Sequence, residues 1–502
     1  MEMWKNIYFG FSVALLPVNL LFCAMGVLLG TLVGVLPGLG PAATIALLLP
    51  LTFNLQPETA LIMLAGIFYG AQYGGSTTSI LVNIPGEASA AITCLDGYKM
   101  ARKGRAGPAL GISAFGSFIG GTLSVLGLMI LGPSLASFSL QFGPSEYFAL
   151  MFLALVILTF LSPGSMIKSF ISAAIGLFLG TIGIDPIGGT RRFTYGTLTL
   201  MDGVGIVPVA MGLFGIAEVL SNLESKEVKD IFKTLIRSLL PNRKDWMESI
   251  GPIVRGSFIG FFLGILPGGG AIMASFTSYA IERRVSRHPE SFGHGAIAGV
   301  AGPETANNAA TGGAMIPLLS LGVPGNIITA LLLGAMMIHG IKPSSIFINQ
   351  YPQIFWGLVT SMYVGNALLL LLNLPMIGLW VRLLKVRYGI LFPLILLICL
   401  VGVYSMNNNI YDILVMLVFG ALGYLMRKVG FEVAPLLFAM IIGPLMETSL
   451  RQTLLQSRGN FIFFFTRPIS ATLIGIGLLL LFWQFLPMGK KLRGKKIREI
   501  VK

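Results

Sequence analysis

The sequence predicts an all-α polytopic membrane protein made of two homologous halves, each with helices broken at glycine and proline. The class rests on composition, because 55% of the 502 residues are hydrophobic and only 11% are charged. Ordinary globular domains carry about 25% charged residues. The prediction of two halves with broken helices rests on a Leu-Pro-Gly motif that occurs in residues 34–40 and again in residues 264–270.

Long uncharged tracts predict the membrane helices. A spanning helix needs about 20 apolar residues, so several tracts hold one helix each and the longest holds two. On that length rule we expect roughly 10 to 14 membrane segments. The tracts are residues 6–57, 59–86, 106–145, 147–167, 343–381, 388–411 and 468–489.

One charged stretch separates the two apolar halves. Residues 221–255 hold twelve charged side chains of both signs, which is typical of a cytoplasmic amphipathic connector. A regulatory domain is the alternative, but independent domains usually have about 50 residues or more. We therefore expect four parts: a first membrane repeat (1–220), the connector (221–255), a second membrane repeat with C-terminal helices (256–489) and a basic cytoplasmic tail (490–502).

The net charge of +14 is an indicator of topology. The bases gather in short segments beside apolar tracts, and such segments mark the cytoplasmic side of a membrane. We therefore expect a multi-pass protein with a cytoplasmic C-terminus and no nucleic-acid partner. The basic segments are residues 99–105, 282–287, 382–387 and 490–502.

The motifs recur in the same order in both halves. "GVLPGLG" (34–40) is followed by "YGGSTTSILVNIPG" (73–86), and "GILPGGG" (264–270) is followed by "TGGAMIPLLSLGVPG" (311–325). Chance recurrence is the alternative in a chain with 63 glycines and 27 prolines, but the common order favours a duplication. Duplicated halves with Gly/Pro-interrupted segments are typical of secondary transporters. Whether the repeat is inverted depends on an odd number of spans in each half.

The breaks themselves predict a binding site. A break in a membrane helix frees backbone N–H groups that attract anions and carbonyls that can hold Na⁺. We expect both breaks to bind substrate near the middle of the membrane. The residues expected to do so are Pro37, Gly38, Gly40, Pro267, Gly268 and Gly269.

Two polar clusters accompany the breaks. In the first half, Ser76, Thr77 and Thr78 are expected to bind substrate, and Ser79 and Asn83 a cation. The alternative is that these small residues serve helix packing, where Ser and Thr let backbones approach.

The second cluster lies in residues 301–313. Here Asn307 and Asn308 are expected to bind substrate, and Glu304 and Thr311 a cation, because acids at membrane depth are costly and usually functional. An interfacial helix cap is the alternative for Glu304.

Several enzyme classes are excluded. The chain has no GxxxxGK[ST] phosphate-binding loop and no HExxH zinc motif, and the first half has no histidine that could serve as a base beside "GGSTTS". We expect no enzymatic activity, and no cofactor other than a possible coupling Na⁺.

The motif blocks resemble a known family. "GVLPGLGPAATIALLLPLTF" (34–53), "YGGSTTSILVNIPGEASAAITCLDGYKMARKGRAGPALG" (73–111), "GILPGGG" (264–270) and "GPETANNAATGGAMIPLLSLGVPG" (302–325) are similar to the large membrane subunit of bacterial tripartite tricarboxylate transporters, the TctA family. The resemblance extends from about residue 15 to residue 485, without a departure in these blocks.

The resemblance implies a solute importer of the bacterial inner membrane with about 12 spans. It implies two partners, a small four-helix membrane subunit and a periplasmic solute-binding protein, and uptake of citrate or related carboxylates by symport with Na⁺ or H⁺. The alternative is a transporter of similar architecture that works alone as a carrier or exporter. In either case we expect alternating access, in which one rigid unit moves relative to the other.

Overall fold

The structure is a computed structural model that describes residues 2–36, 39–162, 165–224, 239–266, 268, 270–344, 346–383 and 388–483. Nearly all regular structure in this part of the chain is helical, as expected for an all-α protein. The elements are α1 (Glu2–Ala14), α2 (Pro17–Gly34), α3 (Pro41–Leu48), η1 (Leu49–Thr52), α4 (Pro57–Val82), η2 (Ala88–Ala91), α5 (Thr93–Arg102), α6 (Ala106–Ser139), α7 (Pro144–Leu161), α8 (Met166–Gly180), β1 (Gly183–Ile184), β2 (Arg191–Arg192), α9 (Ile206–Ala210), η3 (Met211–Ile216), α10 (Ala217–Glu224), α11 (Arg243–Ile265), α12 (Gly270–Val285), η4 (Pro289–Ser291), α13 (Ala298–Leu321), α14 (Ile327–Ile338), α15 (Phe347–Gln350), α16 (Pro352–Leu383), α17 (Tyr388–Asn407), α18 (Ile410–Lys428), α19 (Ala434–Gln456), α20 (Phe463–Thr466) and α21 (Pro468–Trp483).

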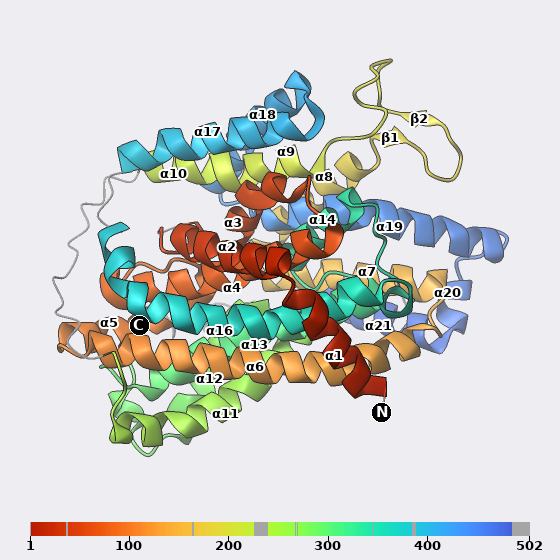
Figure 1. Cartoon of the computed structure of the whole chain (residues 1–502). Coiled ribbons are helices and arrows are strands. Elements are labelled where there is room, and N and C mark those ends of the chain that lie inside the picture. The colour runs from red at the N-terminus through yellow and green to blue at the C-terminus, as the bar shows by residue number, and fades with distance from the viewer. Residues whose placement is uncertain are drawn as a thin grey trace. The chain divides into compact units, whose positions relative to one another are not determined.

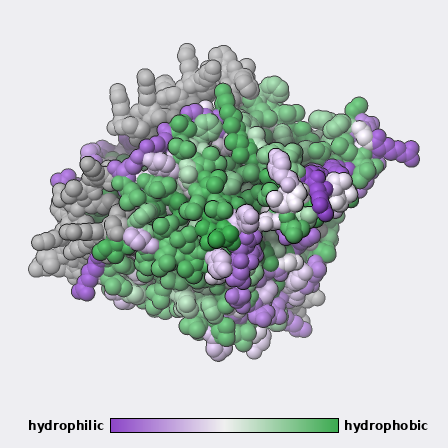
Figure 2. Space-filling view, turned by 90° about the horizontal axis from the view of Figure 1, so that it is seen from above, coloured by the Kyte–Doolittle hydropathy of each residue, from purple (hydrophilic) through white to green (hydrophobic). Residues whose placement is uncertain are grey.

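Seven helices in the described ranges are long and apolar enough to cross a membrane. Five further apolar helices are shorter, with 10–17 residues. Figure 2 shows a broad expanse of hydrophobic side chains on one face, with hydrophilic ones in separate patches. These features confirm a polytopic membrane protein, while the figure of about 12 spans stays a prediction. The seven long helices are Pro17–Gly34, Ala106–Ser139, Pro144–Leu161, Ile206–Glu224, Arg243–Ile265, Pro352–Leu372 and Ile410–Lys428.

The chain forms two compact units, each made of two separate stretches of sequence. Unit 1 comprises Met1–Ser139 and Gly205–Lys428, and unit 2 comprises Leu140–Val204 and Val429–Lys502. The predicted repeats, 1–220 and 256–489, divide the chain differently and stay a prediction. Of the predicted connector, residues 225–238 lie outside the described residues, as does the whole predicted tail.

Two pairs of helices in unit 1 pack through ladders of glycine. In Figure 1 the red helices α2 and α4 lie side by side, as do the green helices α11 and α13. A Cβ atom on any of the ladder glycines would overlap backbone atoms of the facing helix, so only glycine permits this approach. The ladders are Gly26, Gly30 and Gly34 of α2 and Gly256, Gly260 and Gly264 of α11.

The second helix of each pair ends in the same way. The last ladder glycines, Gly34 and Gly264, face Ala71 of α4 and Ala310 of α13. Twelve residues after each alanine comes a residue in the left-handed conformation, Asn83 (φ 58°) in α4 and Gly322 (φ 70°) in α13. Such a residue is a common end of a helix, and the proline that follows two residues later stops it from continuing. The two helix pairs therefore match position by position in this region.

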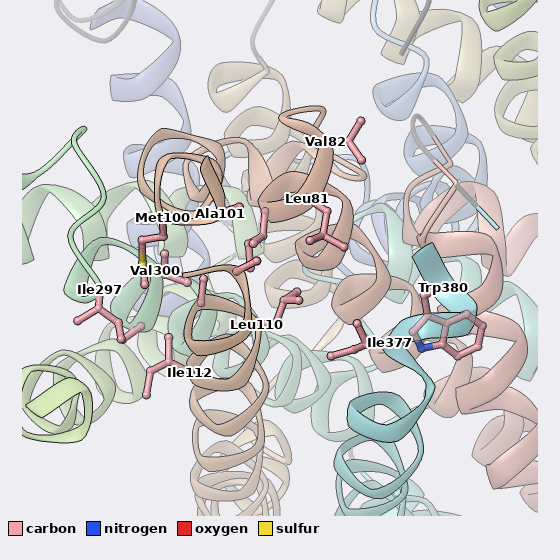
Figure 3. Packing of buried hydrophobic residues seen from close by; sticks show 14 of the residues in the cluster. Leu81, Val82, Met100, Ala101, Leu110, Ile112, Ile297, Val300, Ile377 and Trp380 are labelled. Carbon is pink, nitrogen blue, oxygen red and sulfur yellow. The ribbon is translucent and has the colours of Figure 1, made fainter. Parts of the chain in front are cut away.

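A hydrophobic cluster lies where α4, α5, α6, α13 and α16 meet in unit 1. Leu81 of α4, Met100 of α5, Leu110 of α6 and Val300 of α13 are buried in it, and Trp380 of α16 packs at its edge (Figure 3). This cluster fixes the first turns of α6 and α13 against the end of α4. Several polar side chains of the candidate site lie in the turns that follow in the same two helices.

The loop before α13 is tied to α5 by one buried acid. The Asp96 carboxylate accepts hydrogen bonds from the backbone N–H groups of Gly293 (3.0 Å), Gly295 (2.6 Å) and Ala296 (2.9 Å), and from the Tyr279 hydroxyl (2.8 Å). Asp96 therefore positions the entry to α13.

Unit 2 contains α7, α8, α19, α20 and α21, together with a short antiparallel hairpin of β1 and β2 that the sequence did not predict. Asp185 closes the hairpin through an ion pair with Arg192 of β2 (2.9 Å) and holds it to α19 through an ion pair with Arg451 (2.7 Å). Arg192 also pairs with Glu447 of α19 (2.8 Å). Lys168, near the opposite end of α8, donates to the backbone carbonyl of Val429 just before α19.

Candidate functional site

Each Leu-Pro-Gly break lies beside the Pro-Gly break of the same half. The Cβ of a residue replacing Gly86 would lie 2.9 Å from the carbonyl oxygen of Gly34. In the second half, the N–H of Gly268 donates to the carbonyl of Gly325 at 2.6 Å. Each half therefore brings its two breaks together. Of the predicted break residues, Pro37, Gly38, Pro267 and Gly269 lie outside the described residues.

The first break ends in an N-terminus without a side-chain cap. Gly40 is the extended residue before α3, and no side chain caps the helix that begins at Pro41. The backbone N–H groups of the first turn of a helix have no partner within the helix, and they attract negative charge. Gly40 therefore lies at a place suited to an anion.

Glu304 of α13 is the centre of a buried polar cluster in unit 1. Its side chain is 1% exposed. The hydroxyls of Ser76 (α4) and Thr93 (α5) donate to its carboxylate, and Ser113 (α6) donates at 3.4 Å. Glu304 takes part in none of the ion pairs found among the described residues. The arrangement places hydroxyl oxygens from three helices around one carboxylate of a fourth.

A chain of hydrogen bonds runs beside this cluster. The Thr311 hydroxyl donates to Gln72 Oε1 (2.7 Å), and Gln72 Nε2 donates to Asn307 Oδ1 (3.1 Å). Asn307 Nδ2 then donates to Glu87 Oε1 (2.8 Å), which also accepts from Ser89. Gln72 and Thr311 directly follow Ala71 and Ala310, the alanines that face the last ladder glycines, so equivalent positions of the two helix pairs meet here.

Asn308, the next residue along α13, contacts α6. Its Nδ2 donates to the hydroxyl of Ser117 (2.7 Å) and to the carbonyl of Glu304 (3.3 Å). Its Oδ1 has no hydrogen-bond partner within the described residues, and neither has the hydroxyl of Tyr73, although both groups are buried. Orphaned buried groups of this kind call for an explanation, and an absent ligand or ion is one.

The sequence prediction and the structure can be compared residue by residue. The structure brings Ser76, Glu304, Asn307, Asn308 and Thr311 into one buried region. Gly40 lies beside it, because a Cβ there would be 3.7 Å from the Cβ of Glu87.

The remaining predicted hydroxyls are engaged with backbone. Thr77 donates to the carbonyl of Tyr73 (3.3 Å) and Ser79 to that of Gly75 (2.9 Å), one turn earlier in the same helix. Thr78 donates to the carbonyl of Val35 (2.8 Å), which follows the end of α2. Asn83 is an exposed helix end. Their predicted roles in binding stay predictions.

Sequence reasoning missed Gln72, Thr93, Ser113 and Ser117. Gln72 had one signal, since it lies one turn before Ser76 on the same helix face. The others come from α5 and α6, which carry none of the breaks, and nothing in their spacing separates them from ordinary packing residues.

These features define a class: a polytopic membrane protein in which paired, interrupted helices surround a buried polar cluster, as in membrane transporters. A family model described as "Tripartite tricarboxylate transporter TctA family" matches residues 20–438. The chain belongs to this family. It is a transporter family, whose members work in tripartite systems with a periplasmic binding protein and a small membrane subunit.

Two relatives come from Agrobacterium vitis. One, described as "Uncharacterized 52.8 kDa protein in TAR-I ttuC' 3'region", is 49% identical over 499 residues, which is 99% of each chain. The other, "Uncharacterized protein in TAR-II ttuC' 3'region", is 49% identical over 228 residues, which is 45% of this chain and 94% of that one. No solved structure matches the chain.

Proposed function

We propose that this protein is the translocation subunit of a binding-protein-dependent importer of citrate, other tricarboxylates or related carboxylates. It lies in the bacterial inner membrane with its C-terminus in the cytoplasm, and an Na⁺ or H⁺ gradient drives uptake by alternating access. Its partners are a periplasmic solute-binding protein and a small four-helix membrane subunit. Membership of the TctA family is the observation that carries this proposal.

The chemistry of the breaks supports an anionic substrate. The first turn of α3 offers backbone N–H groups next to Gly40, and the Asn307 amide is close by through its bond to Glu87. These are neutral donors, which bind a carboxylate without holding it as tightly as a lysine or arginine would.

The surroundings of Glu304 support coupling to a cation. A buried carboxylate without a basic partner is unfavourable when ionised, so it attracts a proton or a metal ion. Its hydroxyl neighbours carry the oxygen ligands that hard cations prefer. In this proposal Glu304 belongs to the cation site, and Asn307 and Asn308 to the substrate site.

The match between the two helix pairs supports a repeat around the site. Two halves that each bring a Leu-Pro-Gly and a Pro-Gly break together are suited to an inverted repeat with the substrate near the midplane. A carrier that works alone is the second candidate, and it predicts uptake without either partner.

Uptake into proteoliposomes tests the proposal. Vesicles containing this chain and the small subunit, supplied with the binding protein, should take up citrate or another member of a panel of di- and tricarboxylates. Uptake should require an inward Na⁺ or H⁺ gradient. Asn307→Ala should lower the rate at least about tenfold, while Glu58→Gln, an acid in the first turn of α4, should leave it unchanged.

The outcomes separate the candidates. Uptake by this chain alone would favour the carrier without partners. No uptake of any carboxylate by the complete system, under either gradient, would refute the proposed substrate class. An unchanged rate for Asn307→Ala would remove the proposed substrate site.

A further inference from the structure

Glu87 is a carboxylate that the break motif itself places beside the candidate substrate site. It directly follows the Pro85-Gly86 break and is half-buried. A Cβ on Gly75 would lie 3.0 Å from its Cγ. A Cβ on Gly40, the residue before α3, would lie 3.7 Å from its Cβ. Glu87 therefore packs between α4 and the start of α3.

The direction of the hydrogen-bond chain follows from this carboxylate. Glu87 Oε1 accepts from both Asn307 and Ser89, so Asn307 turns its NH₂ group to Glu87. The Asn307 carbonyl then faces the NH₂ group of Gln72, and the Gln72 carbonyl faces the Thr311 hydroxyl. Gln72 thereby fixes Asn307 as a donor to an anion.

The anion that Asn307 meets in this structure is part of the protein. Asn307 is 1% exposed, and within the described residues its side-chain amide forms hydrogen bonds with Glu87 and Gln72 alone. The NH₂ group carries two N–H donors, of which Glu87 takes one. A substrate carboxylate that takes the same N–H would replace Glu87, and one that takes the second N–H would lie directly beside it. The two negative charges would also repel each other at such a short distance.

We propose that Glu87 is an internal competitor of the substrate: its carboxylate occupies the donor of Asn307 and must leave it before a substrate carboxylate binds there. This inference rests on the proposed function, since it assumes a carboxylate substrate. It gives Glu87 a role in setting affinity, because an ionised competitor weakens binding and thereby eases release.

Binding measurements on charge variants test this role. The intact chain in lipid nanodiscs is titrated with citrate and the other members of the carboxylate panel at one fixed pH and Na⁺ concentration. Glu87→Gln removes the charge and keeps the shape, and the tightest binder should gain about tenfold in affinity, equivalent to about 1.4 kcal/mol. Glu87→Asp keeps the charge and should stay within about threefold of the wild type.

Two further variants control the result. Glu58→Gln removes an acid from the start of α4, the helix that precedes Glu87, and should leave the affinity unchanged. Asn307→Ala, placed in the Glu87→Gln background, should lose the gain, because the shared donor is then missing. Thermal unfolding of each variant shows whether it is folded, and Glu87→Ala replaces Glu87→Gln if the latter is not.

Equal or weaker binding by Glu87→Gln, with the wild type binding a member of the panel, would overturn the competitor role and leave the proposed function intact. If neither the wild type nor any variant binds a carboxylate, the substrate class itself is wrong and the competitor role falls with it.

Discussion

Glu304 gathers more polar partners than any other acid in the candidate site, and all of them are neutral. Ser76, Thr93 and Ser113 come from three different helices, so the carboxylate also ties α4, α5 and α6 to α13. The residue therefore has a structural role that is separable from a role in ion coupling. Substitutions that keep or remove its oxygen atoms distinguish the two.

We predict that Glu304→Gln folds but loses the dependence of uptake on the driving cation. The amide keeps an oxygen that accepts from the hydroxyls and lacks the charge that attracts a cation. Glu304→Ala should lower the free energy of unfolding by roughly 1–3 kcal/mol for each hydroxyl left without a partner. Thermal unfolding in nanodiscs and uptake at varied Na⁺ and pH measure the two effects. Unaltered cation dependence in Glu304→Gln would assign the residue to structure alone.

Gln72 is a positioning residue in the chain of hydrogen bonds. Gln72→Leu has nearly the same volume but leaves Asn307 Oδ1 and the Thr311 hydroxyl without their present partner. Asn307 then loses its fixed orientation, so KM for the carboxylate should rise roughly three- to tenfold while kcat changes little. Gln456→Leu, at an exposed helix end, serves as the control. An equal fall of kcat with an unchanged KM would contradict the positioning role.

At the scale of residues, sequence reasoning identified the conspicuous polar residues of the site but missed several of their partners. Glu304, Asn307 and Ser76 stand out because acids, amides and hydroxyl clusters are rare in apolar tracts. Their partners Thr93 and Gln72 do not stand out, because a single hydroxyl or amide is common in any helix. The packing of α4, α5 and α13 decides which of these side chains are in contact. The spacing of residues along a single helix does not predict that packing.

The glycine ladders are the elements that hold each helix pair together. We predict that Gly30→Leu in α2, or Gly260→Leu in α11, lowers the free energy of unfolding by about 3 kcal/mol or more. Each new side chain would overlap the backbone of the facing helix, at Ile67 and Ala306 respectively.

Helix propensity alone predicts that these substitutions raise the free energy of unfolding, because leucine has a higher helix propensity than glycine. Gly378→Ala in α16 is the control, since a Cβ there meets open space and should be neutral or slightly stabilising. Wild-type stability in Gly30→Leu would show that α2 and α4 do not approach at this glycine.

The hairpin of β1 and β2 depends on Asp185. The Arg451 guanidinium, the N–H of Ile187 and the Arg192 guanidinium hold the pKa of this carboxyl below its usual range. A pKa that is lower in the folded protein means that these contacts stabilise the hairpin above the unfolded pKa of about 3.9. The contribution is lost as the pH falls from there toward the folded pKa.

The protection of residues 183–204 against hydrogen exchange, taken relative to the intrinsic rate at each pH, should therefore fall on acidification from pH 7 to pH 3, and Asp185→Asn should show low protection at both values. Asp202→Asn changes an exposed acid of the same segment and should behave as the wild type. Slow exchange in Asp185→Asn at pH 7 would show that the ion pairs do not hold the hairpin.

At the scale of elements, proline and glycine predicted where helices start and stop. α2, α3, α4 and α7 begin at or next to a proline, and the breaks fall at the Leu-Pro-Gly and Pro-Gly motifs. Asn83 was expected to bind a cation, and the structure shows it in the left-handed conformation that ends α4. The hairpin was missed because two-residue strands leave no alternating pattern to detect.

At the scale of the whole molecule, the basic segments predict sidedness that labelling can check. In a cysteine-free background, Lys103→Cys, within a basic segment, should react with a membrane-impermeant maleimide only after the spheroplast membrane is permeabilised. Labelling of this site in intact spheroplasts would contradict the predicted topology.

The two acids of the site set an order of events for a carrier of carboxylates. When ionised, Glu87 and Glu304 place negative charge close to Asn307, and the described residues offer neither of them an ion-pair partner. In that state a polyanion entering first meets two like charges, whereas a cation entering first neutralises one of them. For the proposed importer we therefore predict sequential binding, with the cation leading. In steady-state kinetics, a higher cation concentration lowers the apparent KM for the carboxylate, and a saturating carboxylate concentration removes the dependence of the rate on the cation.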